Sequence, residues 1–284
     1  MSIIPKKIKI YYAYPSSLNY PTNNYNLDSV ANDFAQYDII ILGNNLDSSS
    51  HQDHNNTITI MNKPILSNTE FCGYVRTGDS LNISKTKIDN WKSMSNRITT
   101  IFCGEFGFDY GITRNKQNNL VDYIHSKGLK VMANSWNPSD IFDGTPAHKL
   151  NNNDWILLES YQIINDQYRS KEDWRERANK AIGYKQTDGI KVACITTSLV
   201  NTYDQNKWDY AYYSSVIDNF DAIGYGEKDY SASTSLMPYR PEPIVYGTEY
   251  RSNIIEDPND IFKRKTNVGV QVDTNLHVAK YLLN

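Results

Sequence analysis

Short apolar segments alternate with longer polar or amphipathic segments along most of the chain. Many are nearly continuous runs of Ile, Val and Leu, as expected of strands that are buried on both faces. Eight such segments occur, at residues 7–14, 37–42, 71–75, 98–103, 129–134, 155–160, 191–197 and 221–226. This alternation predicts repeated βα units and a parallel sheet.

Two of the intervening segments are the clearest helix candidates. Residues 114–127 place apolar side chains on one side of a helix, with Thr113 as N-cap and Gly128 as the stop. Residues 171–185 form the second candidate, and a Thr-Asp-Gly turn follows it. Eight βα units in 284 residues predict an α/β fold, a (β/α)8 TIM barrel, which typically needs ~250 residues.

The last unit departs from the pattern. Residues 231–243 contain Pro238, Pro241 and Pro243 where a helix is expected, and strand-like pieces follow at 244–250 and 267–273. We therefore expect a barrel over residues 1–230. The remaining residues, 231–284, are expected to form a small C-terminal β appendage.

Composition and charge narrow the function. The formal charge is −3 and no long run of Lys or Arg occurs, which argues against nucleic acid as a partner. The chain is 39% hydrophobic and 21% charged, typical of a globular protein and not of a membrane protein. The 22 Tyr and the many Asn suit a sugar-binding surface, although an AT-rich genome gives the same bias.

The cysteines and the N-terminus indicate where the protein is made. Cys72, Cys103 and Cys194 lie in apolar, strand-like contexts and are odd in number, so we expect buried free thiols. The first residues lack the continuous apolar stretch of a secretory signal. We expect synthesis in a cytoplasm, followed by release on lysis or carriage on a larger particle such as a virion.

In a barrel of this kind, the active site is formed by the loops that follow the strands. Polar and aromatic residues at four strand ends are therefore site candidates. The candidate catalytic residues are Glu105, Asp109 and Glu159, and the candidate substrate-binding residues are Asn134, Trp136, Asn137, Tyr161 and Tyr225. Glu227 follows the last strand. Glu159 is the most informative, because its strand carries a carboxylate to its tip, a place suited to a general acid.

A metal site is the competing interpretation. His51, Asp53 and His54 follow the second strand, close enough in sequence to bind an ion such as zinc. The same residues also suit the capped start of a solvated helix. No glycine-rich phosphate loop, serine elbow or Cys-His pair occurs. We expect neither a metal nor another cofactor.

The segment GEFGFDYGITRNKQNNLVDYIHSKGLKVMANSWNPSDIF, residues 104–142, resembles the spherulin-4-like glycoside hydrolases, which are related to endo-α-1,4-polygalactosaminidases. Weaker similarity in YDIIILG, CGYVRTG and DWILLESYQI extends the resemblance over most of residues 7–227. The family implies a barrel that cleaves or binds amino-sugar polysaccharides, and similar domains occur in phage tails. It also implies an acid at the end of strand four and a glutamate at the end of strand six.

Glu159 matches the second of these residues. The first departs from the pattern, since Gly104 stands where the family usually has Asp. Either Glu105 or Asp109 has taken over its role, or the barrel only binds. We therefore expect an endo-acting glycoside hydrolase on an amino-sugar polysaccharide. The alternative is a non-catalytic carbohydrate-binding or structural barrel of a phage tail or similar assembly, with a polysaccharide or cell-surface glycan and other particle subunits as partners.

Overall fold

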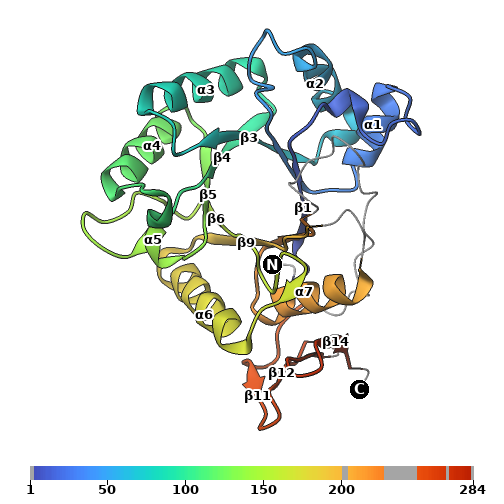
Figure 1. The fold of residues 1–284 in the computed structure, drawn as a ribbon, viewed down its shortest axis with the longest axis vertical. Coiled ribbons are helices and arrows are strands. Elements are labelled where there is room, and N and C mark those ends of the chain that lie inside the picture. Colours follow the sequence, from blue (N-terminus) through green and yellow to red (C-terminus); the bar gives the residue numbers. More distant parts are fainter. Residues whose placement is uncertain (1–2, 200–203, 227–247, 267–268, 283–284) are drawn as a thin grey trace.

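Eight parallel strands close into a barrel in the computed structural model, which describes residues 3–199, 204–226, 248–266 and 269–282 (Figure 1). Around the barrel their order is β1-β10-β9-β6-β5-β4-β3-β2. The strands are β1 Lys6–Tyr11, β2 Ile39–Leu42, β3 Glu70–Arg76, β4 Ile98–Gly104, β5 Lys130–Ser135, β6 Trp155–Leu158, β9 Lys191–Ile195 and β10 Ala222–Gly224. Each of the eight predicted segments overlaps one of these strands. The (β/α)8 fold is confirmed.

Helices surround the barrel (Figure 1). They are α1 Leu27–Phe34, α2 His54–Met61, α3 Leu81–Met94, α4 Arg114–Ser126, α5 Ser139–Phe142, α6 Lys171–Asp188 and α7 Gln205–Ile217, with short 3-10 turns η1 Pro15–Ser17, η2 Pro64–Leu66 and η3 Phe108–Tyr110. Thr113 caps α4 as predicted, accepting a hydrogen bond from the Lys116 amide at 3.3 Å. Helix α6 runs three residues past its predicted end, because Gly189 is the left-handed stop (φ 67°). No described helix is long and apolar enough to cross a membrane.

Alternate residues of each strand face two different cores. The inner core fills the barrel with side chains such as Ile10, Phe102 and Leu157. The outer core lies between the strands and the helices, and Cys103 and Cys194 belong to it. All three cysteines are buried and free, as predicted.

The C-terminal residues form a separate antiparallel sheet beside α6 and α7 (Figure 1). Its strands are β11 Ile255–Glu256, β12 Ile261–Arg264, β13 Val270–Asp273 and β14 Val278–Tyr281, and a small hairpin, β7 Ile163–Ile164 with β8 Gln167–Tyr168, follows β6. Helix α7 packs on β13 and β14. The predicted piece 267–273 contains β13, whereas most of 244–250 and the predicted boundary at residue 230 lie outside the described residues.

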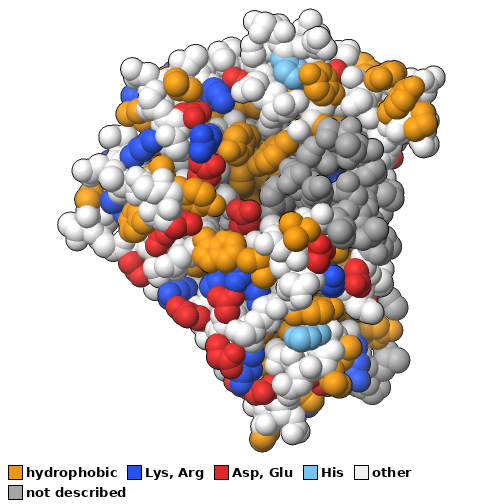
Figure 2. Space-filling model, viewed as in Figure 1, with side chains coloured by type: hydrophobic (Ala, Val, Ile, Leu, Met, Phe, Trp, Pro, Cys, Tyr) orange, Lys and Arg blue, Asp and Glu red, His pale blue; other side chains and the backbone are white. Residues whose placement is uncertain are grey.

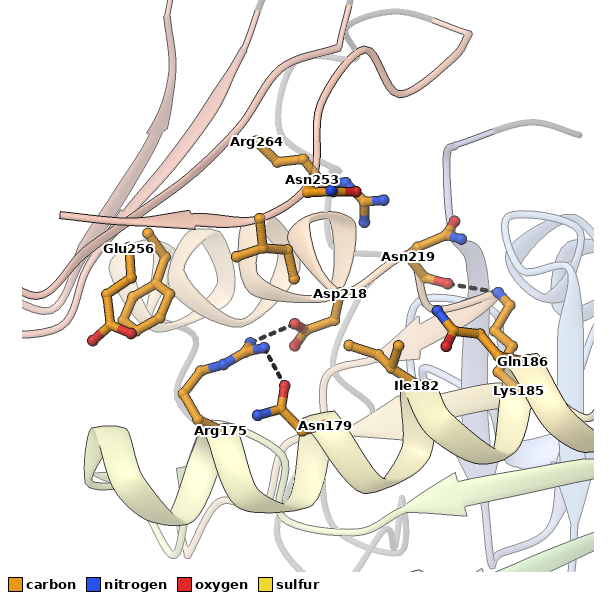
Figure 3. Close-up of a pocket in the computed structure, with 12 residues that line it drawn as sticks. Arg175, Asn179, Ile182, Lys185, Gln186, Asp218, Asn219, Asn253, Glu256 and Arg264 are labelled. Atoms are coloured by element: carbon orange, nitrogen blue, oxygen red, sulfur yellow. Dashed lines mark hydrogen bonds and ion pairs between the residues drawn. The ribbon is translucent and has the colours of Figure 1, made fainter.

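Asp218 joins the barrel wall to two helices. Its carboxylate, at the end of α7, is fully buried and accepts hydrogen bonds from the Tyr161 hydroxyl (2.6 Å) and the Trp174 indole (3.0 Å). Arg175 of α6 completes the set with an ion pair of 2.6 Å (Figure 3). Phe262 of the appendage lies against the same indole and guanidinium. The carboxylate therefore holds α6, α7 and the loop after β6 together.

Asp218→Asn keeps the shape and removes the charge, so it leaves Arg175 without its buried partner. We expect a loss of about 3 kcal/mol of unfolding free energy, measured by urea denaturation, because breaking a buried ion pair from one side is costly. The control is Asp122→Asn, whose partner Lys149 and own side chain are each about half exposed; it should cost less than about 1 kcal/mol. Equal losses in the two variants would contradict this account.

Candidate active site at the barrel mouth

A cavity of about 170 Å³ opens at the carboxyl ends of the barrel strands. It is lined by Ile10, Tyr12, Tyr74, Phe102, Gly104, Glu105, Tyr110, Asn134, Leu157 and Glu159. In Figure 2, hydrophobic side chains border the hollow at the barrel axis, with acidic side chains beside them. The structure thus brings together two of the three predicted carboxylates and one predicted amide.

Glu159 reaches the cavity by simple alternation along β6. Trp155 and Leu157 face the inner core, and Glu159 continues their series one residue beyond the strand. Its backbone is held from α6, because Arg177 donates hydrogen bonds to the carbonyl oxygens of Glu159 (2.6 Å) and Ser160 (3.3 Å). Burial, reinforced by the charge of a neighbouring arginine, lowers the pKa of Arg177 to about 10. Arg177 therefore remains a cation at neutral pH and fixes the strand end.

Glu105 reaches the same cavity by breaking the alternation. Phe102 and Gly104 line the cavity and Cys103 faces outward, so a regular strand would point Glu105 toward the helices. Instead its backbone is left-handed, with φ 56°, an unusual conformation for a residue other than glycine. The Glu105 carboxylate pairs with the Arg76 Nε atom at 2.7 Å, and that hydrogen bond raises the pKa of Arg76. Glu105 is therefore an ion-paired carboxylate in the cavity wall.

Three tyrosines that were not predicted as site residues complete the cavity. The rings of Tyr12 and Tyr74 are 5.2 Å apart, and Tyr110 comes from η3. Burial, followed by the charge of Glu105, raises the pKa of Tyr74 to about 12. Burial, and then the charge of the neighbouring Tyr74 phenol, raises the pKa of Tyr12. Burial, and then the charge of Glu159, raises the pKa of Tyr110. All three phenols therefore stay protonated at neutral pH and can donate hydrogen bonds.

Tyr74 also explains why residue 104 is a glycine. A Cβ atom at Gly104 would lie 2.5 Å from the Tyr74 Cε2 atom and 3.1 Å from its hydroxyl oxygen. The Tyr74 ring itself packs between Tyr12 and Phe102. The space that an aspartate at position 104 would need is therefore filled by a phenol.

The other predicted residues at the ends of β4 and β5 have different surroundings. Asn134 lines the cavity. Asp109 is exposed in η3 and is not among the lining residues; slight burial and then the charge of Asp140 raise its pKa. Trp136 is 37% exposed, and the Arg169 guanidinium lies 4.5 Å from its ring centre. Asn137 lies two residues before α5, and its Oδ1 atom accepts a hydrogen bond from the Ser139 amide at 3.2 Å.

Two predicted stacking tyrosines face the outer core. Tyr161 is only 1% exposed, and its hydroxyl donates to Asp218, because the residue packs between the barrel and the helices. Tyr225 is 8% exposed and its ring packs edge-on against Trp208. In this structure neither ring is available to stack on a ligand, which corrects the expectation for both. Glu227 lies outside the described residues.

The side chains of the alternative metal site, His51, Asp53 and His54, each contact different parts of the chain. The Asp53 carboxylate accepts from the Ser16 amide (2.8 Å) and from the Asn56 side chain (2.8 Å). His54 contacts the Leu46 carbonyl at 2.8 Å, and the His51 ring packs on Tyr14. Within the described ranges no group of three or more His, Cys, Asp or Glu is placed to hold a metal ion.

A larger cavity, of about 600 Å³, lies outside the barrel between α6 and the C-terminal sheet (Figure 3). Its principal charges already have partners within the chain, since Arg175 pairs with Asp218 and Lys185 pairs with Asp221 at 2.8 Å. It also lies away from the strand ends where barrel enzymes carry their chemistry. The smaller cavity at the mouth is therefore the better candidate.

The contact between Gly104 and Tyr74 can be measured by a double-mutant cycle. Gly104→Ala should lower the unfolding free energy by about 1–3 kcal/mol, because the added methyl group overpacks against the ring. In a Tyr74→Ala background the same change should cost less, and the difference is the coupling between the two positions. Urea denaturation of the four proteins gives these values. An unchanged cost of Gly104→Ala in the second background would contradict the steric explanation.

The chain matches no family model and no curated protein sequence. Solved structures resemble it at low identity. Octameric ribulose-1,5-bisphosphate carboxylase/oxygenase from Pyrococcus horikoshii OT3 is 9% identical over 79% of this chain and 52% of its own, with a TM-score of 0.46. The present chain therefore spans about half of that relative.

Two further similar structures are of proteins that act on carbohydrates. A GH5-4 broad specificity endoglucanase from Clostridium longisporum is 9% identical over 70% of this chain and 74% of its own, with a TM-score of 0.45. The pneumococcal virulence factor StrH, described in terms of N-glycan recognition and hydrolysis, is 9% identical over 84% and 80%, with a TM-score of 0.42. The chain shares its barrel fold with glycoside hydrolases and with enzymes of other classes, and the likeness concerns the fold alone.

Proposed function

We propose that the chain is an endo-acting glycoside hydrolase whose substrate is an amino-sugar polysaccharide. The observation that carries the proposal is that Glu105 and Glu159 line one cavity at the barrel mouth. Glycoside hydrolysis uses two carboxyl groups, of which one protonates the leaving oxygen and the other acts on the sugar or on a water molecule. The resemblance of residues 104–142 to spherulin-4-like hydrolases supports the same activity.

The two glutamates suit different roles. Glu105 forms an ion pair with Arg76, so it suits the role that requires a negative charge, either as base or as nucleophile. Glu159 is the other carboxyl group of the cavity and continues a buried strand, so it is assigned the acid role. The phenols of Tyr12, Tyr74 and Tyr110 would hydrogen-bond the hydroxyl groups of the sugar.

The charge and the walls of the cavity favour a sugar with a free amine. Two carboxylates and four aromatic rings surround the space, and Arg76 compensates the charge of one carboxylate. Aromatic faces combined with negative charge attract ammonium groups. An N-acetylated sugar would lose this attraction.

A second candidate function is carbohydrate binding without hydrolysis, as part of a phage tail or another surface-attaching assembly. The Tyr74 ring favours it, because it occupies the space of the aspartate that the resemblance leads one to expect at position 104. The two functions differ in one result. A binding barrel retains oligosaccharides without releasing new reducing ends.

Glu159→Gln tests the hydrolase. Release of reducing ends from partially deacetylated galactosaminan should fall by ~10²-fold or more, as for loss of a general acid, with little change in melting temperature. Glu176→Gln is the matched control, since that side chain is 67% exposed and pairs with Lys180 on the surface of α6; it should keep the parent activity. A Glu159 variant as active as the parent would refute the assigned role.

The proposed recognition of a free amine can be tested by comparing the affinities of two ligands. Galactosamine oligosaccharides should bind about tenfold more tightly than their N-acetylated forms at low salt, and added salt should reduce the difference by screening the charges. Isothermal titration calorimetry at two salt concentrations measures both effects. Equal affinity for the two sugars, independent of salt, would show that the carboxylates do not recognise an amine.

A further inference from the structure

The exposed aromatic side chains of the described residues all lie on one face of the barrel. They are Tyr14, Tyr20, Tyr25, Phe108, Tyr110 and Trp136. The first three follow β1, the next two follow β4, and Trp136 follows β5. Because loops after parallel strands share one end of a barrel, these rings surround the mouth that contains Glu105 and Glu159.

Two of the rings form a pair that stands apart from the cavity. Tyr20 and Tyr25 are 56% and 57% exposed, with ring centroids 4.9 Å apart and planes inclined by 35°. Neither residue lines the cavity at the mouth. Strand β1 lies opposite β5 in the closed barrel, since three strands separate them on either side. The Tyr20–Tyr25 pair and Trp136 therefore follow strands on opposite sides of the mouth.

The loop that carries the pair is held in a specific conformation. The Asp33 carboxylate of α1 accepts hydrogen bonds from the side chains of Asn19 (2.8 Å) and Asn23 (2.7 Å). Asn23 also donates to the Leu18 carbonyl at 2.9 Å. Tyr25 has a left-handed backbone with φ 60°, a conformation that is unfavourable for a bulky residue. The chain thus stabilises a strained loop that keeps two large rings in solvent.

The surroundings of the pair indicate the class of ligand. Exposed aromatic faces offer a flat apolar surface, and the neighbouring Thr22 and Asn24 are exposed hydrogen-bonding groups. Sugar rings present both an apolar C–H face and hydroxyl groups. Nucleic acid fits less well, because the chain has a net charge of −3 and the mouth carries two glutamates.

The geometry points to a distal sugar-binding subsite formed by Tyr20 and Tyr25, which we propose holds a polysaccharide chain that extends across the mouth toward Trp136. This inference rests on the proposed function, since it assumes a carbohydrate in the mouth cavity. It adds a binding position beyond that cavity. Affinity should then grow with the length of the ligand.

The double variant Tyr20→Ala, Tyr25→Asn tests the subsite, with Asn chosen because it tolerates the left-handed backbone. Calorimetry with a galactosamine disaccharide and with partially deacetylated galactosaminan compares short and long ligands. The variant should weaken polymer binding about tenfold more than disaccharide binding, because each lost ring removes a stacking contact. Ile65→Ala is the control, since this side chain is also 55% exposed but precedes β3 at the other end of the barrel.

The outcomes separate the two proposals. If the parent binds the polymer and the double variant binds it equally well, the subsite is wrong and the proposed function stands. If both ligands lose affinity by the same factor, the rings act on the mouth and are not a distal subsite. If the parent binds neither ligand, both proposals are wrong.

Discussion

The closed barrel imposes one constraint on the whole site: every second residue of each strand must share the same narrow interior. Inner side chains from all eight strands meet there, so the size of a side chain on one strand limits the size of the side chain beside it on the next strand. Tyr74 of β3 and Gly104 of β4 show this directly, because the ring occupies the space of the absent side chain. The chemical groups present at the mouth therefore depend on which of two neighbouring strands carries the larger side chain.

The same constraint explains which parts of the site could be predicted from the sequence. The eight strands follow from their apolar runs, and Glu159 continues the inward series of β6. Tyr12 and Tyr74 continue the inward series of β1 and β3 in the same way. Their inward orientation could therefore be predicted from the same alternation, although they lie within the predicted strand segments and not after them.

Other features could not be predicted from local patterns. Tyr161 and Tyr225 follow strands just as Glu159 does, yet both face the outer core. Tyr161 would face inward if the alternation of β6 continued, but the left-handed backbone of Ser160 (φ 53°) interrupts it. Glu105 faces the cavity only because its backbone is left-handed. Asp218 depends on partners brought together by the tertiary fold, 43 to 57 residues away in sequence. Sequence spacing carries no information about such contacts.

The contact between Gly104 and Tyr74 also has an evolutionary consequence. An aspartate cannot be introduced at position 104 while the ring at 74 keeps its place, since even a Cβ atom would lie 2.5 Å from it. Loss of the ring alone would leave a void beside Tyr12 and Phe102. A barrel with an acid at this position and a barrel with the phenol are thus separated by two substitutions, each unfavourable without the other. Lineages that cross between the two forms should change both residues together.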